Sequence, residues 1–349
     1  MPTIQSSKTP AALGYTMPAE WEPHAATWLA WPHNHETWPD KSLARVQETY
    51  LQMIEALLPN EKVHLLVRDS REGHEIKKRL EKMSIRTANL VVHAVSTADA
   101  WIRDYGPTFL KNKKGEKAWN KWTFNAWGGK YDSLREDTRV FADPSLISHP
   151  CFEAGFILEG GSIEVNGVGT CLTTEQCLFN KNRNPKFSRT QIEQSLKDYL
   201  GVSHIVWLKE GIAGDDTDGH IDDIARFVDS STVLAAFEAD PKDANHEILK
   251  KNWEDLKKSE DQNGKKWNVI KLPMPGAVAE GGTRLPASYA NFFIANGVVL
   301  LPIYGHKNDQ EAASILKDLF PKREIISIRC NDLVHGLGAI HCISQQEPQ

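Results

Sequence analysis

Hydrophobic and polar positions along this chain follow a unit that recurs. Three segments, about 60 to 70 residues apart, combine an apolar run, a short polar break and a second apolar run: SIEVNGVGTCLTT, IARFVDSSTVLAAF and YANFFIANGVVLLP. Breaks such as Asn166-Gly167 and Asn296-Gly297 favour tight turns between paired strands. The pattern therefore predicts three β-hairpins.

A helix and a strand are predicted after each hairpin. In SRTQIEQSLKDYLG, Ser188 is a candidate N-cap, Gln191 its capping-box partner and Gly201 the residue that ends the helix. The strand HIVWLK follows. The same order appears in ANHEILKKNWEDLKK before WNVIKL, and in NDQEAASILKDLF before EIISIRC.

The first part of the chain fits the same unit less closely. It contains the strand AATWLAWP, the helix SLARVQETYLQMIEALL, the strand VHLLVR and a further unit that opens at GPTFLKNKKGEKAW. Five hairpin-helix-strand units then cover the chain, and a C-terminal strand around Cys342 completes the first. Such a period predicts α/β modules around an axis or in a row. We expect one domain over residues 1–349, with residues 1–14 as a flexible N-terminal extension; ordinary loop similarity is the alternative.

Polar residues gather where the first strand of each unit begins. The five clusters are WIRDYGPTF, LEGGSI, DDTDGHIDDIARF, TRLPASYANF and GAIHCIS. If rotation relates the units, the five strand starts converge at one end of the axis. One cleft would then hold Asp104, Glu159, His220, Asp222 and Cys342.

These residue types limit the chemistry of such a cleft. A thiol with a nearby imidazole is the minimum for nucleophilic catalysis, because the thiolate is the reactive species. Three carboxylates would raise the pKa of Cys342, unless the substrate brings a positive charge. A guanidinium does so, and carboxylates bind it in bidentate geometry. Trp101 could lie over the same cation.

Overall charge and composition agree with a small cationic ligand. The 349 residues carry a formal net charge of −5, which disfavours a general nucleic-acid or anionic-membrane surface. No apolar stretch approaches the roughly 18 residues of a membrane span, and no signal peptide is recognisable, so we expect a cytoplasmic protein. Five cysteines without CxxC spacing indicate neither a disulfide framework nor a zinc ribbon.

The acidic segment suggests a metal ion as another ligand, and the glycine pairs suggest a nucleotide. DDTDGHIDD does not fit a calcium loop, because Gly214 and Ala225 would occupy the first and twelfth positions. A metal held by His220 and its neighbouring aspartates stays open as an alternative. The glycine pairs lack the GxxxxGK[ST] arrangement, so no nucleotide is expected. We predict no metal and no cofactor.

Longer sequence blocks carry a resemblance to a known family. From MPAEWEPHAATWLAWP through LEGGSIEVNGVGTCLTTEQCLFNKNRNP and GTRLPASYANFFIANG to IHCISQQEP, the chain resembles the agmatine deiminase branch of the guanidine-modifying (pentein) superfamily. The resemblance covers nearly the whole length and keeps the family's order. It implies a five-bladed, pseudo-symmetric α/β propeller. It also implies a cofactor-free enzyme that acts on a small cationic guanidine, and a homodimer or higher even-numbered oligomer.

The resemblance assigns the reacting groups. Cys342 is implied to be the nucleophile that attacks the guanidinium carbon, forming an amidino-thioether as ammonia leaves. His220 in DGHID resembles the general acid and base. Glu159 in LEGGS is implied to orient His220 or to complete the grip on the guanidinium. His341, beside Cys342, would point to the opposite face of a strand and is expected to be structural.

The same resemblance assigns the substrate contacts. Asp104 in WIRDYGPT and Asp222 in GHID are implied to grip the guanidinium nitrogens. Trp101 resembles the ring that packs on the substrate. The PAEW segment lies near the mouth of the site in the family pattern, so Trp21, or Glu20 before it, is a candidate substrate contact.

Substrate choice depends on the far end of the guanidine. Arginine-directed relatives need a cation for the carboxylate, and WTFNAWGGKY offers only Lys130. Agmatine ends in an ammonium, and GDDTDGH supplies an acidic rim of Asp215, Asp216 and Asp218. We therefore expect agmatine deimination to N-carbamoylputrescine and ammonia. The alternatives are a peptidyl-arginine or free-arginine deiminase and, more remotely, a non-catalytic metal-binding scaffold.

The chain departs from the family pattern at two places. Agmatine deiminases commonly have Asn where this chain has Asp218, and Gly-Gly-Asn where this chain has Leu337-Gly338-Ala339. Neither departure touches the implied nucleophile, base or guanidinium carboxylates. Both put the distal substrate contacts in doubt.

Overall fold

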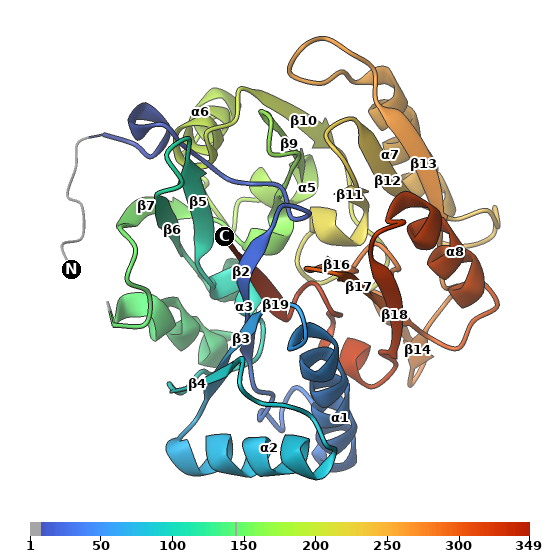
Figure 1. Ribbon diagram of the computed structural model, residues 1–349. Coiled ribbons are helices and arrows are strands. Elements are labelled where there is room, and N and C mark those ends of the chain that lie inside the picture. Colours follow the sequence, from blue (N-terminus) through green and yellow to red (C-terminus); the bar gives the residue numbers. More distant parts are fainter. Residues whose placement is uncertain (1–7, 144) are drawn as a thin grey trace.

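The strands are arranged in small separate sheets (Figure 1). A computed structural model describes residues 8–143 and 145–349, and these residues form five sheets of three or four strands and one two-stranded ribbon. Three sheets contain a hairpin and one parallel strand, in the orders β10-β9-β8, β11-β12-β13 and β16-β17-β18. Their strands are β8 Glu164–Val165, β9 Thr170–Thr174, β10 His204–Leu208, β11 Ala225–Phe227, β12 Thr232–Phe237, β13 Asn268–Pro273, β16 Phe293–Ile294, β17 Val298–Ile303 and β18 Glu324–Arg329.

Two further sheets have four strands each, and a ribbon is added at the edge of the fold. The orders are β1-β5-β6-β7 and β19-β2-β3-β4. Their strands are β1 Tyr15–Thr16, β5 Thr108–Asn112, β6 Lys117–Thr123, β7 Cys151–Ile157, β2 His24–Ala30, β3 Lys62–Val67, β4 Leu90–Ala94 and β19 Ser344–Pro348. The ribbon pairs β14 Ala279–Glu280 with β15 Thr283–Arg284.

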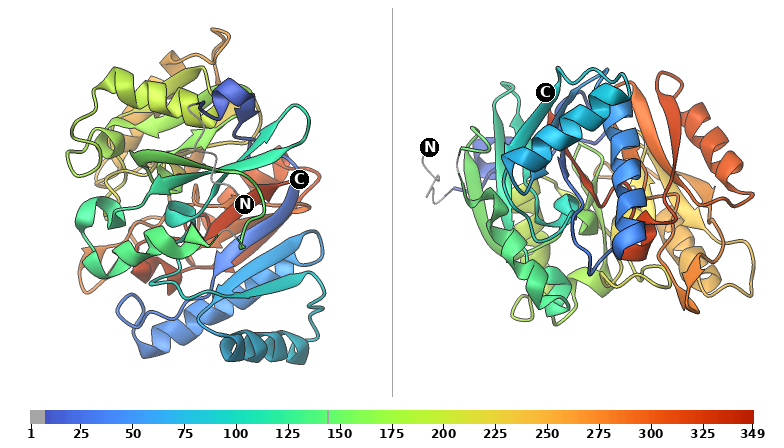
Figure 2. Two further views of the ribbon diagram at one scale, coloured as in Figure 1. Left: turned by 90° about the vertical axis from the view of Figure 1, so that its left-hand side faces the viewer. Right: turned by 90° about the horizontal axis from the view of Figure 1, so that it is seen from below.

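Helices connect the strands within the units. The longer ones are α1 Asp40–Leu57, α2 Ser70–Lys82, α6 Arg189–Leu200, α7 His246–Lys258 and α8 Asp309–Leu319. Figure 2 shows α1 and α2 on the outer side of the sheet that contains β2, β3 and β4. Short helices are α3 Ile102–Tyr105, α4 Ala126–Gly129 and α5 Glu175–Leu178, with 3-10 turns at Ala11–Leu13, Asp132–Ala142, Gly160–Ser162, Ile221–Asp223 and Leu333–Gly336. No helix in the described ranges is long and apolar enough to cross a bilayer.

The three predicted hairpin-helix-strand units are confirmed. Each pairs two strands in antiparallel fashion, continues through a helix and returns as a strand parallel to the second strand of the hairpin. The capping box predicted at Ser188 and Gln191 is present, and Gly201 ends α6 with the left-handed backbone that favours glycine. The apolar face of α6 is buried through Ile192, Leu196 and Leu200.

The C-terminal strand lies beside β2, in the first of the predicted units. Strand β19 pairs antiparallel with β2, so the C-terminal segment completes the first unit as predicted. The strand nevertheless begins at Ser344, and Cys342 lies in the turn before it rather than within it. The backbone N–H of His341 donates to Asn291, and the carbonyl of Cys342 accepts from the N–H of Arg103. These groups are therefore not available for a strand ladder.

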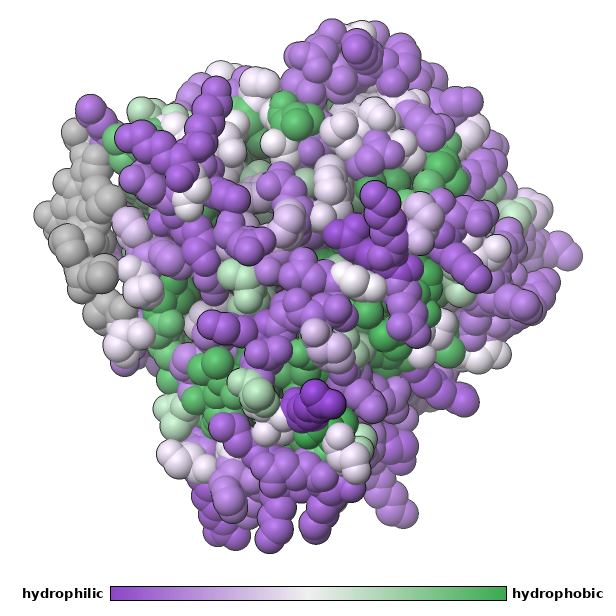
Figure 3. All heavy atoms as spheres, viewed as in Figure 1, coloured by the Kyte–Doolittle hydropathy of each residue, from purple (hydrophilic) through white to green (hydrophobic). Residues whose placement is uncertain are grey.

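The N-terminal segment is described only in part. Residues 1–7 of the predicted extension lie outside the described residues, so that part stays a prediction. Ala11–Leu13 form a 3-10 turn closed by the N–H groups of Leu13, Gly14 and Tyr15. The face shown in Figure 3 is mostly hydrophilic, with apolar residues in smaller groups between the polar ones.

Candidate active site

The five reacting residues predicted from the sequence lie together at the strand starts. Asp104 is on α3 before β5, and Glu159 precedes the 3-10 turn before β8. His220 directly precedes the 3-10 turn Ile221–Asp223 before β11, and Asp222 is its middle residue. Cys342 lies in the turn before β19. The Nδ1 atom of His220 is 3.8 Å from Oδ1 of Asp104, and Sγ of Cys342 is 3.8 Å from Oδ2 of Asp222.

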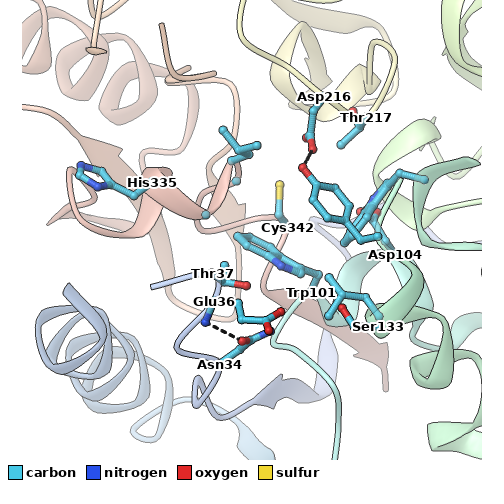
Figure 4. Close-up of a pocket in the computed structure, with 16 residues that line it drawn as sticks. Asn34, Glu36, Thr37, Trp101, Asp104, Ser133, Asp216, Thr217, His335 and Cys342 are labelled. Carbon is cyan, nitrogen blue, oxygen red and sulfur yellow. Dashed lines mark hydrogen bonds between the residues drawn. The ribbon is translucent and has the colours of Figure 1, made fainter. Parts of the chain in front are cut away.

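A cavity of about 310 Å³ opens above the cysteine (Figure 4). Cys342, Asp104 and Trp101 are on its wall, and the sulfur of Cys342 points into it. The ring of Trp101 packs against Trp38, with the two ring centroids 5.2 Å apart. Gly338 lets the ring lie close to the nucleophile, because an added Cβ would be 2.5 Å from Trp101 and 3.1 Å from Cβ of Cys342. Trp101 is therefore placed as predicted, beside the thiol.

Gly161 explains how the imidazole and the two aspartates can converge. A Cβ at this position would lie 2.6 Å from Nδ1 of His220, 2.9 Å from Oδ1 of Asp104 and 3.1 Å from Oδ2 of Asp222. The backbone N–H of Gly161 donates to Oδ1 of Asp104 at 2.9 Å. The glycine pair in LEGGS thus makes room for this group of side chains.

The two aspartates present oxygen atoms to a cation. Oδ2 of Asp104 accepts from the indole N–H of Trp127 at 2.8 Å, and burial, opposed in part by His220, raises the pKa of Asp104 to about 6. Oδ2 of Asp222 accepts from His341, whereas its Oδ1 is fully buried and has no hydrogen-bond partner among the described residues. An unpaired buried carboxylate oxygen is costly, so Asp222 is prepared for a cationic donor.

The imidazole of His220 is held among acidic groups. Burial disfavours its charged form, but Asp104, the thiol of Cys177 and Asp222 outweigh burial and raise the pKa of His220 well above its usual value. His220 is therefore protonated near neutral pH, as a general acid must be before it donates a proton. Glu159, Cys177 and His220 each place one polar atom within 4.8 Å of the others.

The environment of Cys342 favours the thiol until a cation arrives. Burial first, then Asp222, Asp223 and Asp104, raise the pKa of Cys342 well above that of an ordinary cysteine. A backbone hydrogen bond from Ala339 opposes this trend, and the side-chain N–H of Asn291 donates to Sγ at 3.1 Å. A bound guanidinium would add positive charge beside the same aspartates and favour the thiolate.

His341 and Glu20 lie beneath the cavity and do not line it. Nδ1 of His341 contacts Oδ2 of Asp222 at 2.7 Å, and Nε2 contacts Oε2 of Glu20 at 2.8 Å. The ring therefore faces away from the thiol, in keeping with a structural role. Glu20 was a candidate substrate contact, but Arg226 and the N–H of Ile294 hold its carboxylate below the site.

Trp21 is not brought to the cavity. Its half-buried side chain packs against the larger hydrophobic core, and its carbonyl accepts from Arg323 at 2.7 Å. Because Glu20 turns inward to Arg226, the following residue is directed elsewhere. The predicted substrate contact at Trp21 is therefore not supported by its position.

Only one member of the predicted acidic rim lines the cavity. Asp216 is on the wall and accepts from the hydroxyl of Tyr131, and burial raises the pKa of its carboxyl. Asp215 instead accepts from backbone N–H groups of its own loop. Asp218 is bound by Arg183 at 2.6 Å and by Lys130 at 2.7 Å. Of the three aspartates predicted for the rim, only Asp216 therefore lines the cavity. Lys130, the candidate partner for a substrate carboxylate, is already paired with Asp218.

A metal site at His220 does not match its surroundings. The group that could ligate an ion consists of Glu159, Cys177 and His220, without the neighbouring aspartates. The guanidinium of Arg183 is fully buried and donates to Glu159 at 2.8 Å. A positive charge is therefore already present beside these three groups, and a divalent cation would be repelled.

The comparisons with known proteins agree with this geometry. The family described as Porphyromonas-type peptidyl-arginine deiminase matches residues 16–348. The chain belongs to this peptidyl-arginine deiminase family. A Legionella pneumophila protein named "Putative agmatine deiminase" is 38% identical over 99% of this chain and 98% of its own length.

Solved structures extend the family relationship. The agmatine deiminase of Enterococcus faecalis, described as catalyzing its reaction, superposes with a TM-score of 0.93 and 32% identity over the full length of both chains. A cysteine-to-serine variant of the C. jejuni agmatine deiminase with substrate bound gives 0.86 and 32%, with 96% of each chain covered. An amidinotransferase from Microseira wollei (TM-score 0.52, 13% identity, 96% and 97% covered) shares the α/β pentein-like fold alone.

Several site residues of this peptidyl-arginine deiminase family member were missed in the sequence. Asn291, Arg183 and Trp127 act through contacts with residues distant in the chain. The string TRLPASYANF placed Asn291 at a strand start, which was the only available signal. Trp127 could not have been found from its pattern, because it and Ala126 adopt left-handed backbone angles that are uncommon for such residues.

Proposed function

We propose that the protein hydrolyses agmatine to N-carbamoylputrescine and ammonia through a covalent amidino-cysteine intermediate. The observation that carries the proposal is the carboxylate of Asp222: its Oδ2 is 3.8 Å from Sγ of Cys342, and its buried Oδ1 has no hydrogen-bond partner among the described residues. Asp104 lines the cavity and Asp222 lies behind its wall beside Cys342, so the two carboxylates could bind a guanidinium next to a nucleophile. The names of the full-length relatives support agmatine as the guanidine.

The first half of the reaction removes ammonia. Asp104 and Asp222 hold the guanidinium, and its positive charge favours release of the thiol proton of Cys342 to solvent, which leaves the thiolate. Sγ forms a bond to the central carbon, giving a tetrahedral adduct. Protonated His220 then donates its proton to the departing nitrogen, the C–N bond breaks, and ammonia leaves an amidino-thioether.

The second half of the reaction restores the thiol. Neutral His220 accepts a proton from water, and the resulting oxygen nucleophile attacks the amidino carbon. Collapse of this adduct breaks the C–S bond, forms the carbonyl of N-carbamoylputrescine and returns Cys342 to its starting state. Glu159 lies beside the imidazole and is itself held by Arg183, so it keeps the ring oriented through both proton transfers.

The far end of the substrate decides which guanidine is used. The cavity wall carries Asp216 and Tyr131, and Lys130 is bound to Asp218. An ammonium group is attracted to Asp216, whereas the carboxylate of arginine would be repelled by it. This arrangement supports agmatine over free arginine.

A substrate panel tests the proposal. Ammonia release should be measured with agmatine, free arginine and benzoyl-arginine amide, each as kcat/KM. We expect agmatine to be preferred by more than about 100-fold, which corresponds to about 2.7 kcal/mol, because Asp216 would repel the carboxylate of arginine and would find no ammonium on benzoyl-arginine amide. Comparable or better turnover of either arginine compound would overturn the assignment to agmatine.

A single variant locates the source of that preference. Asp216→Asn keeps the size of the side chain and removes its charge, so we expect the agmatine preference to shrink by about tenfold. Asp240→Asn, an exposed carboxylate outside the cavity, serves as the matched control and should leave the preference unchanged. If the preference for agmatine is unchanged in Asp216→Asn, Asp216 does not bind the ammonium group of the substrate.

The same proposal includes the arrangement of the units. We propose that the five sheets are five blades of one pseudo-symmetric propeller. Two observations support it: three sheets repeat the same hairpin-helix-strand order, and the site residues come from the strand starts of different sheets. The likeness to the amidinotransferase supports the fold family.

A further inference from the structure

A row of buried ionic side chains begins beside Cys342, behind the cavity wall, and runs into the core. Asp222 contacts His341 at 2.7 Å, His341 contacts Glu20 at 2.8 Å, and Glu20 accepts from Arg226 at 2.8 Å. Arg226 also donates to Glu164 at 3.0 Å. All five side chains are buried. Only Asp222 is a candidate for touching substrate.

The number of N–H groups on the His341 ring limits the hydrogen bonds that this row can make. Each ring nitrogen of His341 faces a carboxylate oxygen, and neutral imidazole has only one N–H. Burial disfavours ionisation of Asp222, but the hydrogen bond and the charge of His341 outweigh it and lower the pKa of this carboxyl. For Glu20, Arg226 and His341 likewise outweigh burial. Each of the two carboxylates therefore pairs with one ring nitrogen of His341, and the pKa of both carboxyls is lowered.

The charges around Asp222 show why such support is needed. Asp104 and Asp223 are acidic neighbours whose pKa values are raised, by burial first and in part by Asp222, and the thiol of Cys342 is beside Asp222. The positive groups that act on Asp222 include His341, His220, Arg226 and Arg103. Of these, His341 makes the direct hydrogen bond, and it binds Oδ2 so that Oδ1 is left unpartnered.

Glu20 fixes the position of the His341 ring. Oε1 of Glu20 accepts from Arg226 and from the backbone N–H of Ile294, both at 2.8 Å, so the carboxylate is held from the far side. The backbone N–H of His341 donates to Oδ1 of Asn291 at 2.9 Å. The ring is thus fixed at both ends, and its charge stays beneath Asp222.

We propose that Glu20 and His341 are positioning residues that hold the carboxylate of Asp222 aimed at the substrate guanidinium. This inference rests on the proposed function, because it assigns Asp222 to the guanidinium. Neither Glu20 nor His341 lines the cavity. Their effect passes through Asp222, so their loss weakens substrate binding more than it slows the chemical steps.

The test separates binding from chemistry. Agmatine affinity should be measured by calorimetry in the Cys342→Ala protein, alone and combined with Glu20→Gln or His341→Gln. We expect each change to raise the Kd by about 10- to 100-fold, which corresponds to about 1.4 to 2.7 kcal/mol. With Cys342 intact, KM should rise by a similar factor while kcat changes by less than about fivefold.

The chain offers a matched control for Glu20. Glu61 is equally buried, also accepts from a backbone N–H, that of Asn296, and also lies near a histidine, His24. It has no contact with Asp222. Glu61→Gln should therefore lower thermal stability as much as Glu20→Gln does and leave the Kd for agmatine unchanged.

The outcomes are distinguishable. If the unmodified enzyme hydrolyses no agmatine or other guanidine, the proposed function is overturned. If it is active but Glu20→Gln binds agmatine as tightly as Glu61→Gln, the positioning role is overturned and the proposed function stands. In the double variant Glu20→Gln/His341→Gln, affinity losses smaller than the sum of the single losses support one connected row. If His341→Gln does not fold, Glu20→Gln and its control carry the test.

Discussion

Replacing Cys342 with alanine should abolish ammonia release from agmatine. Removal of a catalytic nucleophile costs on the order of 10⁴-fold or more in kcat, because nothing else in the site can form the covalent intermediate. Cys342 is the cysteine that lines the cavity, whereas Cys171, Cys177 and Cys330 are in the core. Residual rate should be measured with a coupled ammonia assay at saturating agmatine.

The fold should survive this replacement. Alanine removes one sulfur atom from the wall of a cavity, so we expect a change in unfolding free energy of no more than about 1 kcal/mol. Cys330→Ala is the matched control, because this thiol is fully buried in the core and should lose stability without losing activity. More than 1% of normal activity in correctly folded Cys342→Ala would contradict the mechanism and restore the scaffold alternative.

Replacing His220 with glutamine should lower kcat by about 10²- to 10⁴-fold. The imidazole donates the proton that ammonia needs and then accepts one from water, and glutamine can do neither. Substrate binding should persist, since Asp104 and Asp222 are intact. The comparison of kcat with the Kd for agmatine, the latter measured in the Cys342→Ala background, checks this expectation.

The pH dependence of kcat/KM gives a second readout from the same variant. Asp104 must be ionised to bind the guanidinium, and its pKa is raised to about 6, so activity should fall as the pH drops through about 6. Burial sets this high value, and the positive charge of His220 partly opposes it. In His220→Gln that opposition is lost, so the acidic limb should move to higher pH.

His246→Gln is a suitable control for this shift. His246 begins α7, and its Nδ1 contacts the carbonyl of Glu238, so it is a partly buried histidine outside the site. Its replacement should leave both kcat and the acidic limb in place. An acidic limb that stays near pH 6 in His220→Gln would mean that the histidine does not act on Asp104.

The repeating units could be predicted because their signals are local. The Asn166-Gly167 turn, the capping box at Ser188 and the glycine at the end of α6 each depend on a few neighbouring residues. Once the units were recognised, their order placed the polar clusters at equivalent strand starts. The convergence of Asp104, Glu159, His220, Asp222 and Cys342 followed from that placement.

The second layer of the site could not be predicted because its contacts are non-local. Arg183 supports Glu159, and His341 joins Asp222 to Glu20 across most of the chain. Hydrophobic periodicity says nothing about such pairs. They also explain two incorrect details: Glu20 is turned into the core by Arg226, and Asp218 is removed from the rim by Arg183.

The backbone conformation around Cys342 could not be predicted from the hydrophobic pattern either. The apolar run predicted a strand through the cysteine, but Asn291 and Arg103 take the hydrogen-bonding groups that a strand would use. The resulting turn lets Sγ face the cavity while the ring of His341 faces Asp222. In a strand, the side chains of His341 and Cys342 would also point to opposite sides, because successive residues of a pleated strand alternate.

The most direct test of the account is to trap the covalent intermediate. The enzyme should be quenched in acid during turnover of agmatine, digested, and analysed by mass spectrometry of its cysteine-containing peptides. We expect the C-terminal peptide to carry, on Cys342, the added mass of agmatine less ammonia, and we expect this adduct to disappear when agmatine is exhausted. Turnover without an adduct on Cys342 at any quench time, or an adduct that forms on another cysteine, would contradict the mechanism.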